Sequence, residues 1–301
     1  MSTLIIPPPT TRPTAEILLL LVAIIWGTSY GITKEALLYI SVFGFLTLRF
    51  GLSTLLLLPF VWMEWRSNPT TDWKYAIPTG IILLAIFIAE TYGITQTTAS
   101  NAAFLISLCL LFTPFIEWLI FRQRPSKRIF VMVGLSLVGV SLLSLNTDHQ
   151  LSLNRGDAYI LLAALLRGCM VVATKKLLHG KSISSLSVTA IQSSVVFVGA
   201  LLLLLINEPL SIHTLPTEST FWLLVLYVVC FCTIFAFFAQ NYGVRKTSAT
   251  RASVLMGSEP AFGAMFAIVW LGESLSLLQL AGGVLIVIAT LLASVKQKIP
   301  H

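Results

Sequence analysis

Long, continuously apolar runs separated by short polar segments dominate the hydropathy pattern of the chain. A helix needs roughly 20 mostly apolar residues to cross the hydrocarbon core of a bilayer, and ten runs approach or reach this length. The predicted spans cover residues 17–33, 42–61, 75–95, 99–120, 129–146, 157–174, 185–206, 221–244, 252–271 and 276–295. Membrane β-strands alternate between apolar and polar positions, which these runs do not, so the pattern favours helices. The longest connection, 207–220, leaves no room for a soluble domain, and we predict an all-α integral membrane protein with ten transmembrane helices.

The composition of the 301-residue chain agrees with lipid as its main solvent. Apolar residues make up 56% and charged residues only 10%, whereas soluble proteins carry about 25% charged residues. Mean hydropathy is +0.91. The first apolar run follows a single basic residue, Arg12, and lacks a small-residue cleavage pattern, which indicates a retained first span instead of a signal peptide.

The basic residues predict the orientation of the chain. Fifteen of the nineteen Lys and Arg residues fall on one side of the predicted topology, at the N-terminus, in loops 62–74, 121–128, 175–184 and 245–251, and at the C-terminus. The opposite side has only Lys34 and Arg155, and Arg49 and Arg167 lie inside spans. Because short cytoplasmic loops carry an excess of Lys and Arg, both termini are predicted to be cytoplasmic. The net charge of +7 is spread over six short segments, which excludes a nucleic-acid-binding surface.

The chain contains an internal repeat. Residues 87–102 and 237–252 share seven identities at an offset of 150, where chance would give about one. A second match, at an offset of 141, pairs residues 23–37 with residues 164–178. Since each copy has five spans, the second copy enters the membrane from the opposite side. Inverted repeats of this kind recur in secondary transporters, while a duplication kept only for stability is the alternative.

These observations predict the organisation of the chain. It divides into a flexible cytoplasmic N-terminus (1–15), a first five-helix repeat (16–146), an external linker (147–156), a second five-helix repeat (157–296) and a cytoplasmic tail (297–301).

Several short motifs resemble those of the drug/metabolite transporter superfamily, in its ten-helix, EamA-type branch. They are Trp26–Gly27, Leu48–Phe50, the Y-G-x-x-x-T-x-A pattern from Tyr92, Leu271–Glu273 and Gly282–Gly283. The chain departs from the pattern at Phe121–Gln123, where L-G-E is expected, and at Arg167, where Trp is expected. The resemblance implies a secondary transporter, similar overall to amino-acid exporters of the YddG type. It also implies that the recurring arginine of the second span, Arg49 here, is structural.

Arg167 is the first candidate for a substrate contact, because ionisable groups inside a bilayer are costly and mark function. It aligns with Trp26, and both lie near the middle of the first span of their repeat. Such residues should approach one another near the pseudo-twofold axis. A guanidinium there could bind a carboxylate through two hydrogen bonds. The alternative is a structural ion pair with Glu90 or Glu259.

Further candidates follow from the repeat and from helix spacing. Repeat-equivalent Glu90 and Gln240, with Thr91 and Asn241 after them, indicate a cavity lined from both halves. Glu259 precedes a proline and could hold an ammonium group, carry a proton or anchor a helix junction.

Aromatic residues and three helix breakers complete the candidate set. Trp26 and Tyr30 share a helix face, as a stacking wall, a cation–π surface or an apolar seam, and Phe87 and Phe237 flank the polar pairs. Gly27 and Gly31 permit close helix contact. The predicted hinges are Gly93, Gly243 and Pro260.

We therefore predict a multi-pass protein of the bacterial inner membrane that exports small organic metabolites by alternating access. Amino acids, aromatic and other neutral ones, are the favoured substrates, and efflux of lipophilic cationic drugs is the alternative. No H-E-x-x-H, G-x-S-x-G or Walker motif occurs, which argues against an intramembrane enzyme and against nucleotide hydrolysis. No metal-ligand spacing accompanies the cysteines or histidines, and no catalytic residue or cofactor is predicted. The expected partners are a small-molecule substrate and membrane lipid.

Overall fold

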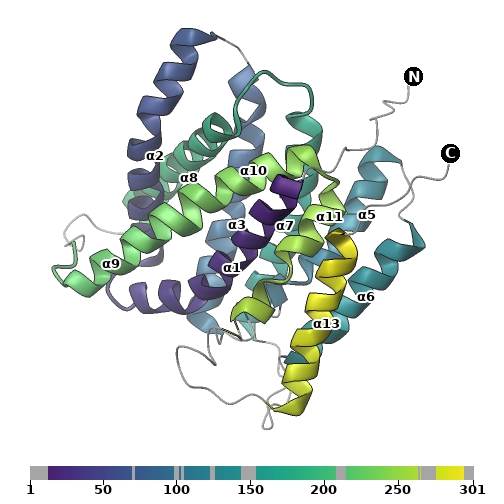
Figure 1. Cartoon of the computed structure of the whole chain (residues 1–301). Coiled ribbons are helices and arrows are strands. Elements are labelled where there is room, and N and C mark those ends of the chain that lie inside the picture. The colour runs from purple at the N-terminus through teal and green to yellow at the C-terminus, as the bar shows by residue number, and fades with distance from the viewer. Residues whose placement is uncertain are drawn as a thin grey trace.

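The computed structural model describes residues 13–69, 72–97, 102, 105–122, 126–143, 154–207, 215–263, 265 and 276–294. All regular elements among these residues are helices (Figure 1). They are α1 (Pro13–Ala36), α2 (Val42–Ser67), η1 (Asp72–Tyr75), α3 (Ile77–Gln96), α5 (Cys109–Phe121), α6 (Lys127–Leu143), α7 (Arg155–Leu177), α8 (Ser185–Asn207), α9 (Ser219–Tyr227), η3 (Val228–Phe235), α10 (Ala236–Lys246), α11 (Ala249–Met256) and α13 (Leu277–Ser294).

A described helix covers part or all of each predicted span. Six helical segments are long and apolar enough to cross a membrane, namely Pro13–Ala36, Val42–Ser67, Asp72–Gln96, Arg155–Leu177, Ser185–Asn207 and Ser219–Lys246. The first and sixth spans run beyond their predicted limits, because their helices continue into polar flanking residues. The ten-span topology, the orientation of the termini and the repeat boundaries stay predictions. The flanking segments 1–12 and 295–301, and most of the linker, lie outside the described residues.

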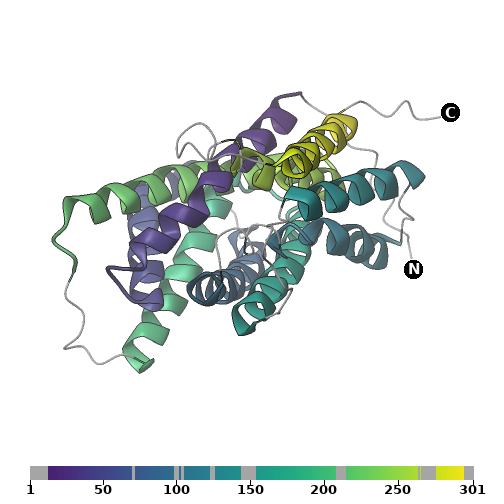
Figure 2. The same ribbon diagram turned by 90° about the horizontal axis from the view of Figure 1, so that it is seen from below.

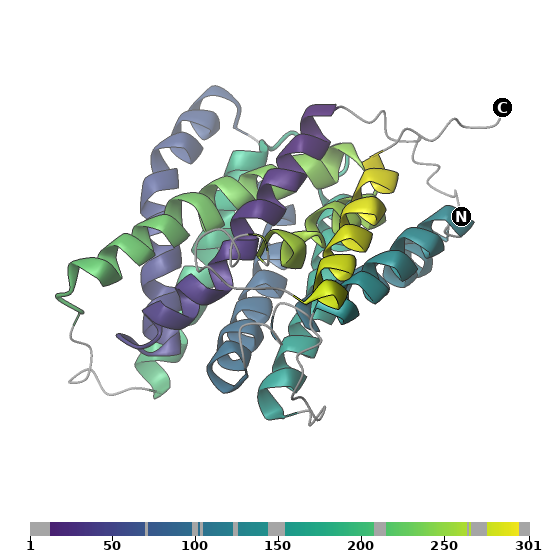
Figure 3. The same cartoon turned by 60° about the horizontal axis from the view of Figure 1, so that its bottom comes forward.

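Two pairs of helices form the flanks of the bundle. Helix α6 packs along α13 at one edge and α2 packs along α8 at the other, with α1, α3, α7 and α10 between them (Figures 1 and 3). Seen from below, α9 lies far from α6 and α13 (Figure 2). The outward faces carry large apolar side chains, and Leu223 and Ile206 are 67% and 77% exposed. Such faces suit lipid as a solvent better than water.

Helix α1 makes backbone contact with the chain around residue 263. A Cβ atom added to Gly27 would lie 2.7 Å from the Glu259 carbonyl oxygen and 2.8 Å from the Gly263 nitrogen. No heavier residue fits at Gly27, as the sequence predicts for this glycine. The close contact predicted for Gly31 is not found, since a Cβ there would meet no described atom within 4 Å.

Two helices are interrupted at repeat-equivalent positions. A turn at residues 107–108 precedes α5, and a turn at residues 257–258 follows α11, after which the helix resumes at Glu259. The second interruption lies just before Pro260, the proline that the sequence predicts to loosen this helix. Discontinuous membrane helices often carry the binding sites of transporters, because broken backbone is tolerated only where it is buried in protein or lines a cavity.

Candidate functional site

A buried ion cluster joins three helical segments at the centre of the bundle. Arg167, near the middle of α7, donates from Nη2 to Glu90 Oε2 of α3 at 3.1 Å and from Nη1 to Glu259 Oε2 at 3.3 Å. The three side chains are only 17%, 10% and 4% exposed. The hydroxyl of Tyr30 lies beside the Glu259 carboxylate. The guanidinium therefore makes both of the pairings that the sequence offers as structural alternatives.

Aromatic rings cover one side of this ion cluster. The Arg167 guanidinium lies 4.9 Å from the centroid of the Trp26 ring, within cation–π distance. Trp26 packs on Phe237, with centroids 5.5 Å apart, and Phe237 packs on Phe87 at 5.8 Å. The Trp26 indole is fixed because Nε1 donates to the Cys232 carbonyl oxygen at 3.0 Å. The result is a preformed wall of three rings next to a guanidinium and two carboxylates.

Repeat-equivalent residues meet at this centre. Trp26 and Arg167, related by the offset of 141, stack on one another, as predicted. Phe87 and Phe237, related by the offset of 150, also touch. A residue contacts its own equivalent only when both lie close to the symmetry axis that relates the two copies. The candidate site therefore lies where two related halves meet.

Two small cavities flank the ion cluster. The larger, of about 30 Å³, is lined by Trp26, Phe87, Arg167, Phe237, Gln240 and Glu259 among others. The smaller, of about 10 Å³, is lined by Trp26, Tyr30, Phe87, Glu90, Thr91 and Arg167 among others. One water needs about 10–15 Å³ of such space, so neither cavity admits an organic molecule. The centre is therefore closely packed in this structure.

The Asn241 side chain points away from the central cavities, unlike the other predicted polar residues. Its amide donates to Gln192 Oε1 at 2.8 Å and to Thr189 Oγ1 at 3.0 Å, and Gln192 donates to Thr79 at 2.8 Å. This network joins α10 to α8 and α3, and Asn241 lines neither central cavity. The geometry assigns Asn241 a structural contact in this conformation.

The predicted hinge glycines are sites of close packing. A Cβ added to Gly93 would lie 2.5 Å from Ile160 Cδ1, and one added to Gly243 would lie 2.6 Å from Leu19 Cγ. These two contacts are repeat-equivalent, since Leu19 corresponds to Ile160. Close approach therefore gives a reason for both glycines that does not involve bending. The hinge role of both glycines, and of Pro260, stays a prediction.

Arg49 contributes more to the site than the sequence suggests. Its guanidinium lies 4.6 Å from the Phe87 ring centroid, and its Nε donates to Thr233 Oγ1 at 2.7 Å. Thr233 belongs to the π-helical segment η3, whose Cys232 carbonyl also receives the Trp26 indole. Wider π-helical turns often occur at functional sites. No proline or glycine marks residues 228–235, so the sequence contains no local signal for this segment.

The lining of the larger cavity includes residues that the sequence does not single out. They include Ser107 and Cys109 at the interruption before α5, Ser253 within α11, and Gly257 at the interruption after α11. The repeat signal at Ala102 and Ala252 ends just before these residues, which were therefore missed.

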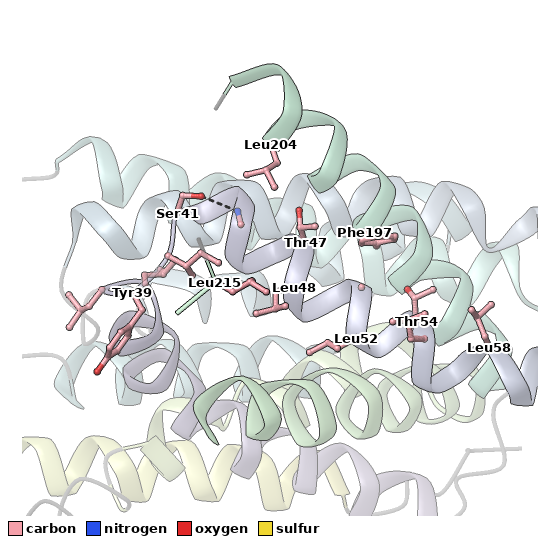
Figure 4. Close-up of a pocket in the computed structure, with 16 residues that line it drawn as sticks. Tyr39, Ser41, Thr47, Leu48, Leu52, Thr54, Leu58, Phe197, Leu204 and Leu215 are labelled. Carbon is pink, nitrogen blue, oxygen red and sulfur yellow. Dashed lines mark hydrogen bonds between the residues drawn. The ribbon is translucent and has the colours of Figure 1, made fainter. Parts of the chain in front are cut away.

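A larger groove lies on the flank of the bundle, away from the ion cluster (Figure 4). Its volume is about 720 Å³, and it runs along α2 between α8 and residues 37–41. The Thr47 and Thr54 side chains and several leucines line it, whereas no carboxylate, guanidinium or amine does among the described residues. None of the predicted site residues lies there. The central cluster, and not this groove, has the chemistry to recognise a charged metabolite.

A bundle of membrane-length apolar helices with a buried ion cluster at its centre defines a multi-pass membrane protein built around a polar site. The model of the EamA-like transporter family matches the chain twice, over residues 13–145 and 154–295. The chain belongs to this family, in two halves, and is a transporter of the kind found in the drug/metabolite transporter superfamily.

Similar proteins agree with this assignment. An uncharacterized transporter of Archaeoglobus fulgidus is 30% identical over 286 residues, covering 94% of this chain and 86% of that protein. A Salmonella typhimurium protein named a probable amino-acid metabolite efflux pump is 24% identical over 281 residues, covering 89% and 91%. A solved crystal structure shares the fold with a TM-score of 0.74 at 14% identity, over 94% of this chain and 97% of that one.

Proposed function

We propose that the protein exports small organic metabolites, above all neutral and aromatic amino acids, by alternating access through the site around Arg167. The two halves would form an inverted repeat in the bacterial inner membrane, with both termini cytoplasmic. The meeting of a guanidinium, two carboxylates and three aromatic rings at the junction of the halves supports this proposal most directly.

The chemistry of the cluster matches a zwitterion. A substrate carboxylate would replace one glutamate on the Arg167 guanidinium, which offers a planar, bidentate surface. The released glutamate would then pair with the substrate ammonium. Exchange of ion pairs keeps every buried charge compensated, and leaving one uncompensated would be costly. An aromatic or aliphatic side chain would pack against Trp26, Phe87 and Phe237.

Contacts at the helix ends support the inverted arrangement. Lys34 at the end of α1 and Asp157 at the start of α7 both bond to Thr97. Glu16 at the start of α1 pairs with Arg251, at the opposite end of the bundle. These contacts support opposite directions for α1 and α7, the first helices of the two halves, as an odd number of spans per copy would require.

Efflux of lipophilic cations is the second candidate. Two carboxylates face a single guanidinium, so the cluster carries a formal charge of −1 when all three groups are ionised. A monovalent organic cation would compensate that charge and stack on the aromatic wall. Unlike a zwitterion, it would gain nothing from Arg167.

Transport by purified protein in liposomes would separate the two candidates. We expect uptake of labelled neutral amino acids, with decarboxylated amines as poor competitors. Arg167→Gln should raise the KM for amino acids at least tenfold, and Arg155→Gln, an exposed arginine on the same helix, should leave it unchanged. Transport of the amines in preference to the amino acids would refute the amino-acid assignment. An unchanged KM in a well-folded Arg167→Gln variant would refute the role of Arg167.

A further inference from the structure

Two lysines hold the ends of two equivalent helices. Lys34 Nζ donates to the Thr97 carbonyl oxygen at 3.1 Å, and Lys175 Nζ donates to the Thr247 carbonyl oxygen. Thr97 is the C-cap of α3 and Thr247 the C-cap of α10. The free carbonyls at a helix C-terminus carry partial negative charge, so an ammonium group there is attracted to them. Each lysine thus ties the end of its own α1 or α7 to the end of α3 or α10.

A carboxylate from the other half of the protein accompanies each of these contacts. Thr97 Oγ1 donates to Asp157 Oδ1 at 2.6 Å at one end. At the opposite end, Glu16 Oε1 lies 2.6 Å from Arg251 Nη2, one turn beyond the cap of α10. Asp157 and Glu16 are repeat-equivalent, as are the two lysines and the two threonines. A fastening made of a lysine, a C-capping threonine and a carboxylate contact therefore occurs at each end of the bundle, but the carboxylate accepts from Thr97 at one end and pairs with Arg251 at the other.

The fastenings lie at the two ends of the bundle, on either side of the candidate site. Helices α3 and α7 meet at the Lys34 end, and α1 and α10 meet at the Lys175 end. The site around Arg167 lies between the two ends. Both fastenings are closed in this structure, which agrees with central cavities of about 30 and 10 Å³.

We propose that Lys34 and Lys175 are positioning residues that latch opposite ends of the transporter and are released one at a time during transport. The Lys34 latch consists of Lys34, Thr97 and Asp157, and the Lys175 latch of Lys175, Thr247 and the Glu16–Arg251 pair. The proposal rests on alternating access, as proposed above, but not on the identity of the substrate. Removing one lysine opens the central site toward one side of the membrane only.

The two latches differ in burial, which predicts different strengths. Lys175 is only 7% exposed, whereas Lys34 is exposed to solvent. A charge at a helix C-terminus contributes more when it is partly buried than when it is solvated. We expect loss of Lys175 to shift the equilibrium toward the open form of its end about tenfold. Loss of Lys34 should shift the equilibrium at the other end about threefold.

A native cysteine reports the opening of the site without any substrate. Cys109 lines the larger central cavity at the first residue of α5. Replacing the other cysteines, Cys169, Cys230 and Cys232, by alanine leaves it as the single thiol. Its rate of reaction with a small, membrane-impermeant thiosulfonate is then measured in right-side-out and in inside-out vesicles.

We expect Lys34→Met to speed labelling of Cys109 about threefold in one vesicle orientation, and Lys175→Met to speed it about tenfold in the other. Arg155→Met and Lys176→Met are the matched controls, because they remove an exposed charge at the same two ends. If Lys175→Met does not fold, Arg251→Gln breaks the same latch and should act in the same orientation.

Two results would overturn the latches: acceleration in the same orientation by both lysine variants, or no acceleration beyond the matched controls. Opposite-sided labelling together with failure to transport amino acids would keep the latches and reject the substrate. Amino-acid transport without any difference in labelling between the two vesicle orientations would keep the substrate assignment and reject the latches.

Discussion

Removal of Arg167 should destabilise the protein far more than removal of the whole ion cluster. Arg167→Met leaves Glu90 and Glu259 without the guanidinium that pairs with both of them, at a depth where both side chains are at most 10% exposed. Each pair in the cluster, at 3.1 and 3.3 Å, represents about 5 kcal/mol of attraction at an effective dielectric constant of about 20. Desolvation offsets much of this attraction, and breaking a buried ion pair costs about 3–5 kcal/mol in practice.

A triple variant tests whether that cost comes from stranded charge. Arg167→Met with Glu90→Gln and Glu259→Gln removes all three charges of the cluster together, and replacement of a whole buried ion cluster is often close to neutral. We expect the single variant to lose about 3–5 kcal/mol and the triple variant to recover most of that loss. Arg155→Met, which removes an exposed arginine from the same helix, should change stability by less than about 0.5 kcal/mol.

Thermal unfolding of detergent-solubilised protein, followed by tryptophan fluorescence, provides the measurement. The order of apparent Tm values should be wild type, then the triple variant, then Arg167→Met. A single variant as stable as wild type would show that the cluster is open to water and that its charges need no partner. A triple variant less stable than Arg167→Met would show that the glutamates are held by groups other than the guanidinium.

Three further predictions concern topology, packing and the aromatic wall. Cysteines at the exposed, repeat-equivalent positions Gln96 and Lys246 should react with impermeant reagents from opposite sides of the membrane, and reaction from one side would refute the inverted repeat. Gly93→Ala should lower the apparent Tm, because its Cβ would lie 2.5 Å from Ile160 Cδ1. Adding Ile160→Val should restore part of the loss. An unchanged Tm would show that α7 can move away from α3 to make room for the methyl group. Trp26→Phe keeps an aromatic ring but removes the indole N–H that donates to the Cys232 carbonyl oxygen of η3. We expect the unfolding free energy to fall by about 0.5–1.5 kcal/mol. An unchanged unfolding free energy would show that this hydrogen bond does not contribute to stability.

The sequence predicts those features of the site that follow from the repeat. The approach of Trp26 to Arg167 requires only that two aligned mid-span residues lie near a symmetry axis, and the structure shows that contact. The closeness of helix α1 to its neighbour at Gly27 follows from the absence of a side chain. The first of these contacts is predicted from the alignment of the two repeats and the second from the size of the residue, and neither from hydrophobic periodicity.

Features that depend on helix rotation were not predictable from the sequence. Helices α3 and α8 are apolar almost all round, so hydrophobic periodicity does not tell which face of such a helix is buried. Asn241 lies on α10, and its direction depends on Thr189 and Gln192 of α8, which the repeat signal does not identify. The π-helical turn at Thr233 likewise depends on tertiary contacts, because it is Arg49 that bonds to the Thr233 hydroxyl.

Charge is distributed unequally over the repeat-equivalent positions around the cavity. Arg167 corresponds to Trp26, Glu90 to Gln240, and Glu259 to Cys109, so each pair has one ionisable and one uncharged member. Residues on a symmetry axis lie beside their own equivalents, and two like charges there would repel strongly in a medium of low dielectric constant.

Both ion pairs of Arg167 join different helical segments. Arg167 is on α7, Glu90 is on α3, and Glu259 follows the interruption after α11. If α3 and the segment carrying Glu259 tilt in turn, one glutamate leaves the guanidinium while the other keeps it paired. A substrate carboxylate then fills the vacant side of Arg167 from whichever face is open. In this scheme Arg167 would keep a counter-ion throughout, which is the condition for holding a charged group at the centre of a membrane protein during a transport cycle.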